Sequence, residues 1–282
     1  MQVLITGAAG RLGQLMRAAW ADCGHLGFDP IWSRRGAGAR QDVTWDILSG
    51  PAPDIAKGAV ILHLAGVLRG DRAALSANAV MARKVCMAAK LAGASHVFLA
   101  SSAAIYGAAN RDHVEVQAPA PVSDYGHAKL DMEREALCWA HSLGPDAPGV
   151  TCLRIGNVVG ADTLFGGVNP SWHVVLDPVP GQPGGPIRSY IGPQALAQVL
   201  AGLLAHVGAN LPKILNVAAP GAVSMADLLD AAQIPYSFGK PNVGAIAKVS
   251  LSTKRLAALI PLCPTNAAAM VADWRGLMAA AA

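Results

Sequence analysis

Three glycines, each three residues after the last, follow the first apolar run of the chain. Gly7, Gly10 and Gly13 come directly after the apolar residues 3–5, where a helical pattern begins at residues 11–20. Glycine lets backbone amides approach a pyrophosphate closely, and the N-terminus of a helix adds partial positive charge. A tight strand–helix turn without a ligand would need the same glycines. The motif therefore indicates a dinucleotide site only if the rest of the chain builds the matching sheet.

Short apolar runs alternate with helical patterns along most of the chain. Nearly continuous apolar strands separated by helices are typical of a parallel sheet that is covered on both faces. We therefore predict an α/β fold, a doubly wound (Rossmann) parallel sheet with a smaller C-terminal substrate-binding lobe. The predicted strands are residues 3–5, 30–33, 42–45, 60–65, 97–100, 150–155 and 214–218, and the predicted helices are residues 11–20, 78–92, 125–142, 194–206 and 224–232.

The composition of the chain changes after about residue 160. Residues 165–186 are dense in glycine and proline, which excludes a long helix or a central strand there. This stretch is either a flexible linker or a shaped loop over a site. We predict a nucleotide-binding core with the catalytic motif at residues 1–160 and an interleaved substrate-binding lobe at residues 161–282. The alanine-rich C-terminal end is expected to fray.

Composition also excludes several functional classes. The balance of 22 Lys+Arg against 18 Asp+Glu gives a net charge of +4, without the basic stripe of a nucleic-acid-binding protein. The five cysteines are scattered, and no pair has metal-ligand spacing. No apolar stretch is long enough to cross a bilayer. We expect a cytoplasmic protein with reduced thiols, without a metal site and without nucleic-acid or membrane partners.

Two stretches carry candidate catalytic groups. Tyr125 and Lys129 are four residues apart at the start of a predicted helix, so they share one face. An exposed helix pair is the alternative interpretation. If the pair is functional, the charge of Lys129 lowers the pKa of the Tyr125 phenol, which then exchanges a proton with a hydroxyl or carbonyl group. Ser102, after the predicted strand 97–100, is the candidate for holding the substrate oxygen, whereas Ser101 suits an ordinary turn.

Together these stretches resemble the extended short-chain dehydrogenases/reductases, in the NAD(P)-dependent epimerase/dehydratase branch. The matching motifs occur in the order and at the spacing of that family, up to about residue 160. They are residues 6–13 (TGAAGRLG), 63–66 (HLAG), 101–107 (SSAAIYG), 125–129 (YGHAK) and 153–160 (LRIGNVVG). Weaker similarities continue at residues 188–191, 216–218 and 252–256.

The resemblance implies a role for each matching residue. Tyr125 is expected to be the acid/base, Lys129 to tune it and bind the nicotinamide ribose, Ser102 to polarise the reacting oxygen and Asn78 to support this network. Cofactor contacts are expected from Gly7, Ala9, Gly10, Arg11, Leu12, Gly13, Ser33, Arg34, Arg35, Asp46, Ile47, Leu64, Ala65, Gly66, Ser101, Tyr125, Lys129, Ile155, Asn157 and Val158. Substrate contacts are expected from Ser102, Ala103, Asn157, Trp172 and Arg188. Plain packing is the alternative, above all for Ile155 and Asn78.

The chain also departs from the family at informative positions. Many relatives end the second strand on an Asp that binds the adenosine ribose, but here Ser33 is followed by Arg34 and Arg35. A carboxylate repels a 2′-phosphate and a guanidinium binds it, so NADP(H) is favoured over NAD(H). Asp29 would reverse this preference if the strand ended earlier. Ala103 and Ala104 replace the Asp-Glu pair of dehydrating relatives, which disfavours dehydration because methyl groups cannot relay protons.

These observations give one leading functional hypothesis and two alternatives. The leading hypothesis is an NAD(P)-dependent oxidoreductase that transfers a hydride between the nicotinamide cofactor and a secondary alcohol or ketone of a sugar-like substrate. The first alternative is a nucleotide-sugar 4-epimerase with retained NAD. The second is a non-catalytic dinucleotide-sensing protein, against which the Tyr125 and Lys129 pair argues. The resemblance further implies a homodimer that is formed by the helices predicted at residues 78–92 and 125–142.

Overall fold

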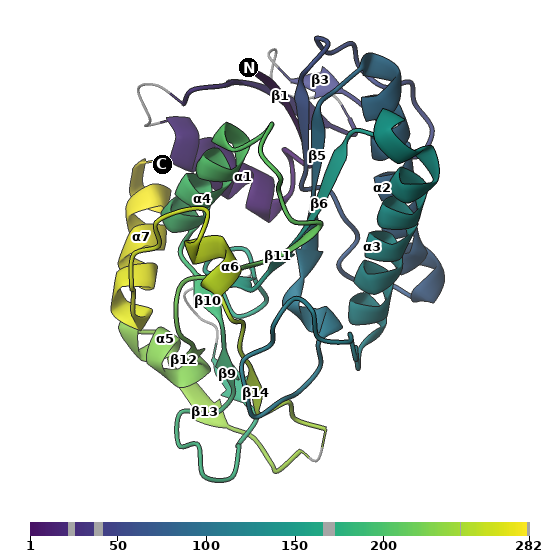
Figure 1. Ribbon diagram of the computed structural model, residues 1–282. Helices are drawn as coiled ribbons and strands as arrows, with labels where there is room; N and C mark the ends of the chain where they lie inside the picture. Colours follow the sequence, from purple (N-terminus) through teal and green to yellow (C-terminus); the bar gives the residue numbers. More distant parts are fainter. Residues whose placement is uncertain (22–25, 37–41, 166–172, 243, 281–282) are drawn as a thin grey trace.

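A parallel sheet of seven strands forms the centre of the molecule (Figure 1). The computed structural model describes residues 1–21, 26–36, 42–165, 173–242 and 244–280. The strand order is β11-β6-β5-β4-β1-β2-β3. The strands are β1 (Gln2–Thr6), β2 (Asp29–Arg34), β3 (Val43–Thr44), β4 (Val60–His63), β5 (His96–Ser102), β6 (Gly149–Ile155) and β11 (Ile214–Val217).

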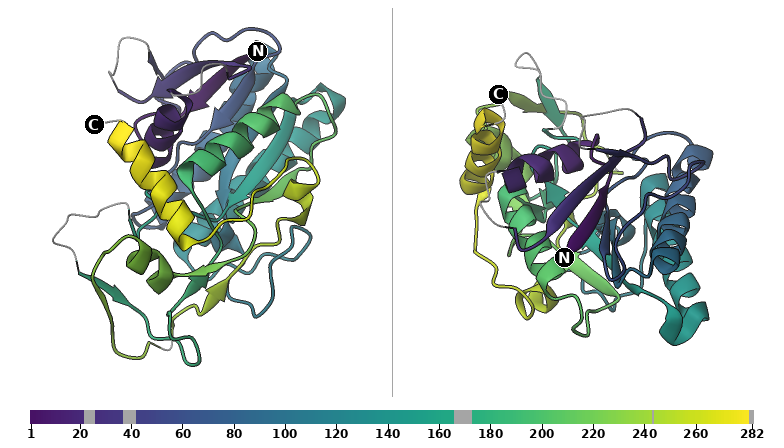
Figure 2. Two further views of the ribbon diagram at one scale, coloured as in Figure 1. Left: turned by 90° about the vertical axis from the view of Figure 1, so that its left-hand side faces the viewer. Right: turned by 90° about the horizontal axis from the view of Figure 1, so that it is seen from above.

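Helices cover both faces of this sheet, as the view from above shows (Figure 2). Alternate residues of one strand enter opposite cores, so Leu4 packs toward one helical layer while Val3 and Ile5 pack toward the other. This two-sided burial explains why the strand sequences are continuously apolar. No helix of the described part of the chain has the length and apolar character needed to span a membrane. One layer holds α2 (Arg72–Ala92) and α3 (Asp124–Leu143), and the other holds α1 (Arg11–Ala21), α4 (Pro193–Ala205) and α7 (Ala267–Ala280).

Smaller elements gather beyond the carboxyl ends of the central strands (Figure 1). Three short sheets are formed by the strand pairs β10–β7 and β13–β8 and by the order β12-β9-β14. Residues after 161 also return to the central sheet through β11, which pairs with β6. The remaining elements are β7 (Asn157–Val158), β8 (Val174–Leu176), β9 (Ile187–Arg188), β10 (Tyr190–Ile191), β12 (Val223–Ser224), β13 (Tyr236–Phe238), β14 (Lys248–Val249), α5 (Met225–Ala231), α6 (Lys254–Ala257), and the 3-10 turns η1 (Ala103–Ile105) and η2 (Gly144–Asp146).

The predicted doubly wound sheet is confirmed, with differences at the ends of elements. Helix α2 begins at Arg72, six residues before the predicted start at residue 78, because the Asp71 side chain caps it by accepting from the amide of Ala74. The strand predicted at residues 60–65 ends at His63, where the chain turns into the loop after β4. Part of the glycine- and proline-rich stretch forms β8, and residues 166–172 lie outside the described residues.

The expectation that the C-terminal end frays is wrong for residues 267–280. They form α7, which buries Met270 and Leu277 against the layer of α1 and α4. The carboxylate of Asp273 also accepts hydrogen bonds from the amides of Gln194 and Ala195, so it satisfies free donors at the start of α4. Packing of a few large side chains therefore fixes a helix whose sequence is mostly alanine.

The packing of α7 predicts different effects for two methionines of the same helix. Met270 is 3% exposed and Met278 is 50% exposed. We expect Met270→Ala to lower the free energy of unfolding by about 2–5 kcal/mol, because it leaves a cavity in the core. Met278→Ala should change it by less than about 0.5 kcal/mol. Urea unfolding followed by tryptophan fluorescence measures both, and equal effects would contradict the packing of this helix.

Candidate active site

A cavity of about 570 Å³ opens at the carboxyl ends of the central strands. Strand β1 lies between β2 and β4. The sheet continues through β2 to β3 on one side of β1 and through β4, β5 and β6 to β11 on the other, so the direction of strand addition reverses at β1. Ligands of open α/β sheets bind at such a switch point. The cavity is bordered by the loop between β1 and α1, the end of β2, the loop after β4, the end of β5 and the start of α3.

The glycine loop at one side of the cavity is closed by contacts between backbones. Gly7 has a φ of +81°, and a Cβ at this position would lie 2.6 Å from the amide nitrogen of Ala65. A Cβ at Gly13 would lie 2.2 Å from the carbonyl oxygen of Gly7. Only glycine fits at these two positions, which places the N-terminus of α1 at the cavity, where Gly10 and Arg11 line it. A helix N-terminus in this place suits a pyrophosphate.

The end of β2 supplies the positive charge of the cavity. Ser33 is buried opposite Thr6 in the strand register, and Arg34 and Arg35 follow it along the cavity wall. The Nε atom of Arg34 and the Nε1 atom of Trp45 are buried without a hydrogen-bond partner among the described residues. Buried donors without a partner are rare in proteins. Both residues line the cavity, so these donors fit a site for a polar ligand.

Asp46, a carboxylate that also lines the cavity, is bonded within its own loop. Asp46 accepts from the hydroxyl of Ser49 at 2.7 Å and from the amide of Leu48 at 3.1 Å. The bond from Ser49 is the largest cause that lowers the pKa of Asp46, and the charge of Arg35 contributes. Asp46 therefore caps the turn after β3, and the end of β2 itself carries no carboxylate after Asp29.

Three predicted catalytic side chains meet at the other end of the cavity. Ser123 caps α3 by accepting from the amide of Gly126, which places Tyr125 in the first turn and Lys129 one turn later on the same face. The ammonium of Lys129 donates to the carbonyl oxygen of Ala100 at 2.8 Å and lies 5.9 Å from the centre of the Tyr125 ring. The hydroxyls of Tyr125 and Ser102 are hydrogen-bonded to one another.

Burial controls the protonation of this group of side chains. It raises the pKa of the Tyr125 phenol, and the hydrogen bond with Ser102 opposes that change. The expectation that Lys129 lowers the pKa of Tyr125 below its usual value is therefore wrong for this structure. Burial also lowers the pKa of Lys129, which is 4% exposed, to about 8. The ammonium bonds to Ala100, and burial is the largest cause of the change in the Tyr125 pKa.

Thr6 lines the cavity and is paired with His63 of β4. The Nδ1 atom of His63 lies 2.7 Å from the hydroxyl oxygen of Thr6. Burial, with a smaller contribution from the charge of Lys129, lowers the pKa of His63 to about 3. At neutral pH this imidazole is therefore uncharged, and it acts as a structural partner of β1.

Asn78 lies behind the cavity wall. Its side-chain oxygen accepts from the amide of Val67 at 3.0 Å, and its side-chain nitrogen donates to the carbonyl oxygens of Val67 at 3.0 Å and Leu75 at 2.9 Å. A Cβ at Gly66 would lie 3.0 Å from the Asn78 oxygen and 3.3 Å from the Lys129 nitrogen. Asn78 thus holds the loop after β4 close to Lys129, but it does not line the cavity formed by the described residues.

Asp162 and the bridge made by Arg11 are not expected from the sequence. The guanidinium of Arg11 donates to the carbonyl oxygen of Asp162 at 3.0 Å, so the glycine loop is joined to the loop after β7. The carboxylate of Asp162 accepts from the hydroxyl of Tyr190 at 2.9 Å, and burial raises its pKa. Asp162 lines the cavity together with Asn157. Its place two residues after Gly160, the last residue of a family-like motif, is the signal that could have revealed it.

Most predicted site residues lie together in this cavity. Every residue predicted to contact the cofactor lines it, as does Ser102. Ala103 is packed in the core, and the guanidinium of Arg188 donates to the carbonyl oxygens of Ile187, Ile246 and Ala247, so neither is among the described lining residues. Trp172 lies outside the described residues. The lining residues that were not predicted are Thr6, Trp45, Leu48, Val67, Leu68, Met81, Ala100, Gly156, Ala161 and Asp162.

The geometry fits a dinucleotide that extends from Arg34 and Arg35 to Tyr125. The glycine loop at the start of α1 suits the pyrophosphate, and the buried donors without partners suit the polar groups at the adenosine end. Among the described residues, no three His, Cys, Asp or Glu side chains are arranged to hold a metal ion.

Comparisons with known proteins agree with this architecture. The model of the NAD dependent epimerase/dehydratase family matches residues 3–171. No curated protein matches the chain. Among solved structures, UDP-glucose-4-epimerase from Stenotrophomonas maltophila, with bound NAD and formylated UDP-arabinopyranose, is 20% identical over 100% of both chains, with a TM-score of 0.79.

Two further structures have the same fold. MoeE5, in complex with UDP-glucuronic acid and NAD, is 19% identical over 100% of both chains, with a TM-score of 0.77. UDP-glucuronic acid 4-epimerase from Bacillus cereus, in complex with UDP-glucuronic acid and NAD, is 17% identical over 99% of both chains, with a TM-score of 0.76. The central sheet and the lobe beyond its carboxyl ends are thus an arrangement that known enzymes share.

Proposed function

The chain belongs to the NAD dependent epimerase/dehydratase family, and we propose that it is an NAD(P)-dependent oxidoreductase acting on a secondary alcohol or ketone of a sugar-like substrate. The proposal rests on one observation. Tyr125, Lys129 and Ser102 line the same cavity as the glycine loop. The cofactor, when bound, supplies the hydride exchange, and the protein supplies orientation and proton transfer.

Each side chain has a distinct task in this proposal. Tyr125 exchanges the proton with the reacting oxygen, which the Ser102 hydroxyl orients. Because burial raises the pKa of Tyr125, the phenol keeps its proton at neutral pH, a state that suits protonation of a carbonyl oxygen during reduction. Lys129, fixed by its bond to Ala100, places a positive charge beside the phenol and stabilises the phenolate once the proton has left.

We also propose that the site accepts the 2′-phosphate of NADP(H). The family description and the similar structures name NAD. In this chain, however, the end of β2 carries Ser33, Arg34 and Arg35 along the cavity, and a guanidinium binds a phosphate where a carboxylate would repel it. The Nε atom of Arg34, buried without a partner among the described residues, supports a ligand at this position.

A nucleotide-sugar 4-epimerase is the second candidate function. It is favoured by the similar structures, two of which are 4-epimerases described with NAD. Such an enzyme ends its cycle with the cofactor unchanged, so NAD retained in the purified protein would support it, whereas net consumption of NADPH with a carbonyl substrate would support the reductase. Dehydration is disfavoured because Ala103 and Ala104 offer only methyl groups after the catalytic hydroxyl.

Replacing Tyr125 tests the proposed proton transfer. A thermal-shift panel of NAD, NADP, sugars and UDP-sugars first identifies the ligands that stabilise the protein. With these ligands, we expect Tyr125→Phe to lower kcat by about 10²–10⁴-fold, because no proton reaches the substrate oxygen. Cofactor affinity should stay unchanged, as should the kcat of the control Tyr236→Phe on β13. Unchanged turnover in Tyr125→Phe would refute the assigned role.

Replacing Arg35 tests the cofactor preference. Arg35 is exposed at the cavity wall, so its removal leaves the core intact. We expect Arg35→Ala to weaken NADP⁺ binding by about tenfold or more and to leave NAD⁺ binding unchanged, because a charged hydrogen bond to the phosphate is lost. Calorimetric titration of both cofactors measures this, with Arg111→Ala, an exposed arginine outside the cavity, as the control. If the unmodified protein binds NADP⁺ no more tightly than NAD⁺, this proposal is wrong.

We further propose that two copies of this chain pair through α2 and α3 in the cytoplasm. Helix α2 exposes Met87 and Leu91, of which Leu91 is 87% exposed. We expect a dimeric mass by light scattering, and a monomeric mass for the double variant Met87→Asp/Leu91→Asp, because charges in an apolar interface are costly. Met278→Asp on α7 should remain dimeric. A monomeric mass of the unmodified protein would contradict the proposal.

A further inference from the structure

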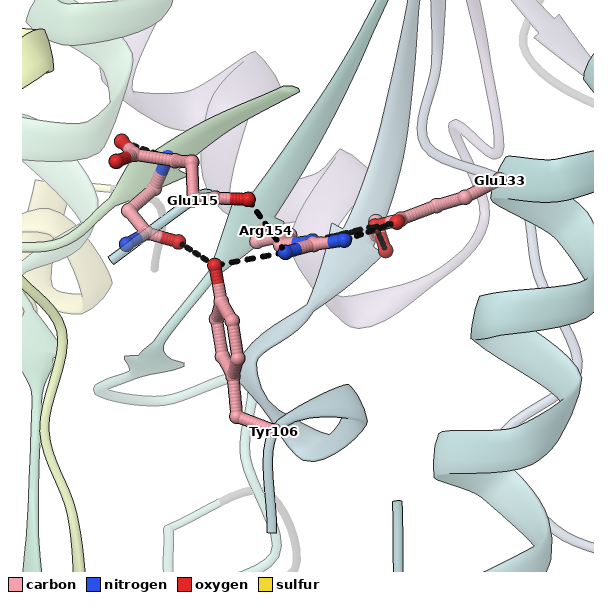
Figure 3. Close-up of polar contacts among 6 residues, drawn as sticks. Tyr106, Glu115, Glu133 and Arg154 are labelled. Carbon is pink, nitrogen blue, oxygen red and sulfur yellow. Dashed lines mark hydrogen bonds and ion pairs between the residues drawn. The ribbon is translucent and has the colours of Figure 1, made fainter. Parts of the chain in front are cut away.

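A buried ion pair joins Arg154 of β6 to Glu133 of α3 (Figure 3). Arg154 of β6 donates to the Glu133 carboxylate of α3 at 2.7 Å from Nη2 and at 3.0 Å from Nε. The two side chains are 2% and 3% exposed. The other terminal nitrogen of Arg154 donates to the hydroxyl of Tyr106 at 2.8 Å, so the guanidinium is held from two sides.

Glu133 contacts both elements that carry the proposed catalytic groups. The Ser101 hydroxyl donates to Glu133 at 2.5 Å, and Ser101 lines the cavity immediately before Ser102. On α3, Glu133 follows Lys129 by four residues, so the two side chains share one face. The carboxylate is thus hydrogen-bonded to strand β5, which carries Ser102, and lies one helical turn after Lys129 on α3.

We propose that Glu133 is a positioning residue of the proton-transfer site, where its carboxylate, fixed by Arg154, maintains the positive charge of Lys129 and anchors Ser101 next to Ser102. The proposal rests on the proposed function, in which Lys129 assists Tyr125. It assigns a task to a buried pair that is not among the described residues lining the cavity.

The electrostatics around Lys129 support this assignment. Burial lowers the pKa of Lys129 to about 8, and the charge of Glu133 is the largest effect that raises it again. Burial keeps the imidazole of His63 neutral, and burial raises the pKa of the Cys152 thiol well above its usual value. The ionisable groups that face Lys129 from the packed elements are Tyr125 and Glu133 of α3, His63 of β4 and Cys152 of β6, with Cys86 of α2 behind Cys152. Arg154 of β6 pairs with Glu133.

Among these groups of the described chain, Glu133 is the carboxylate that acts on Lys129. Its carboxylate accepts hydrogen bonds from the Nε and Nη2 atoms of Arg154 and from the Ser101 hydroxyl, which hold it in place. The charge of Glu133 can affect Lys129 across one turn of α3, because apolar surroundings screen electrostatic interactions poorly. Burial lowers the pKa of Lys129, and the charge of Glu133 opposes this effect. Without Glu133, the pKa of Lys129 falls further, so the ammonium loses its proton at lower pH.

The test measures the titration of Lys129 directly. The full-length protein is labelled with [¹³C]lysine, and the ¹³Cε signal of Lys129 is assigned by its loss in Lys129→Met. We expect a midpoint near pH 8 in the unmodified protein. In Glu133→Gln the midpoint should fall by about one pH unit, as expected for removal of a nearby opposite charge.

A carboxylate at the far end of the same network provides the matched control. Glu115 is buried, accepts from the amide of Asn216 at 3.1 Å, and pairs with Arg255 at 3.7 Å, away from Lys129. Glu115→Gln should disturb the packing to a similar degree and leave the Lys129 midpoint unchanged. An equal shift in both variants would show a general loss of structure, and that result would overturn the proposal.

A second variant covers the case in which Glu133→Gln does not fold because Arg154 is left unpaired. Glu133→Gln/Arg154→Met removes both buried charges, and replacement of a buried pair by apolar groups is often tolerated. Because Glu133 is the partner that raises the Lys129 pKa, the midpoint should also fall in this variant. A folded variant in which Lys129 titrates as in the unmodified protein would refute the proposal.

The kinetic readout separates this proposal from the proposed function. Activity that needs the charged form of Lys129 is lost as pH rises through its pKa, so the alkaline limb of kcat should move to lower pH in Glu133→Gln. If Tyr125→Phe retains full turnover while the NMR midpoint still falls, the catalytic assignment fails and the electrostatic link between Glu133 and Lys129 stands. If Tyr125→Phe is inactive and the midpoint does not move, only the role of Glu133 fails.

Discussion

Backbone segments from β1, α1 and the loop after β4 approach one another without any side chain between them. The distances at Gly7 and Gly13 leave no room for a Cβ, so the strand must turn directly into a helix that begins at the cavity. The same contact brings Ala65 against Gly7, and the loop after β4 then continues to Gly66, which lies against Asn78 and Lys129. The geometry at the catalytic end therefore depends on glycines at the pyrophosphate end.

The second constraint is the burial of the sheet on both faces. Strands that are apolar on both sides can place polar side chains only where they are paired or where the strands end. Thr6, which lines the cavity, pairs with His63 across neighbouring strands. Arg154, near the end of β6, needs both Glu133 and Tyr106 to satisfy its guanidinium. Polar chemistry thus concentrates at one edge of the sheet as a consequence of the packing.

Sequence patterns predict those elements of the structure that are determined by residues close together in the chain. The glycine loop, the alternation of strands and helices that indicates a doubly wound sheet, and the shared face of Tyr125 and Lys129 follow from spacing alone. Helix α7 does not, because alanine gives no clear pattern and its position is set by a few contacts with distant helices. The bridge from Arg11 to Asp162 joins residues that are far apart in the sequence. The pKa change of Tyr125 also depends on burial, which spacing does not describe, so its direction was predicted wrongly.

The two ends of the cavity place their charges in different environments. Arg35 is exposed, so water weakens its interactions, and several donors together are needed to bind one phosphate there. Lys129 is buried, and in such surroundings a single ammonium, a single phenol and a single carboxylate strongly affect one another. Desolvation destabilises the charged forms of both Tyr125 and Lys129. A protein that uses them for proton transfer therefore needs a compensating charge, and that charge must lie outside the space for the substrate. A carboxylate one helical turn deeper, held by an arginine from the sheet, meets both requirements, because it acts through the apolar core and leaves the cavity free.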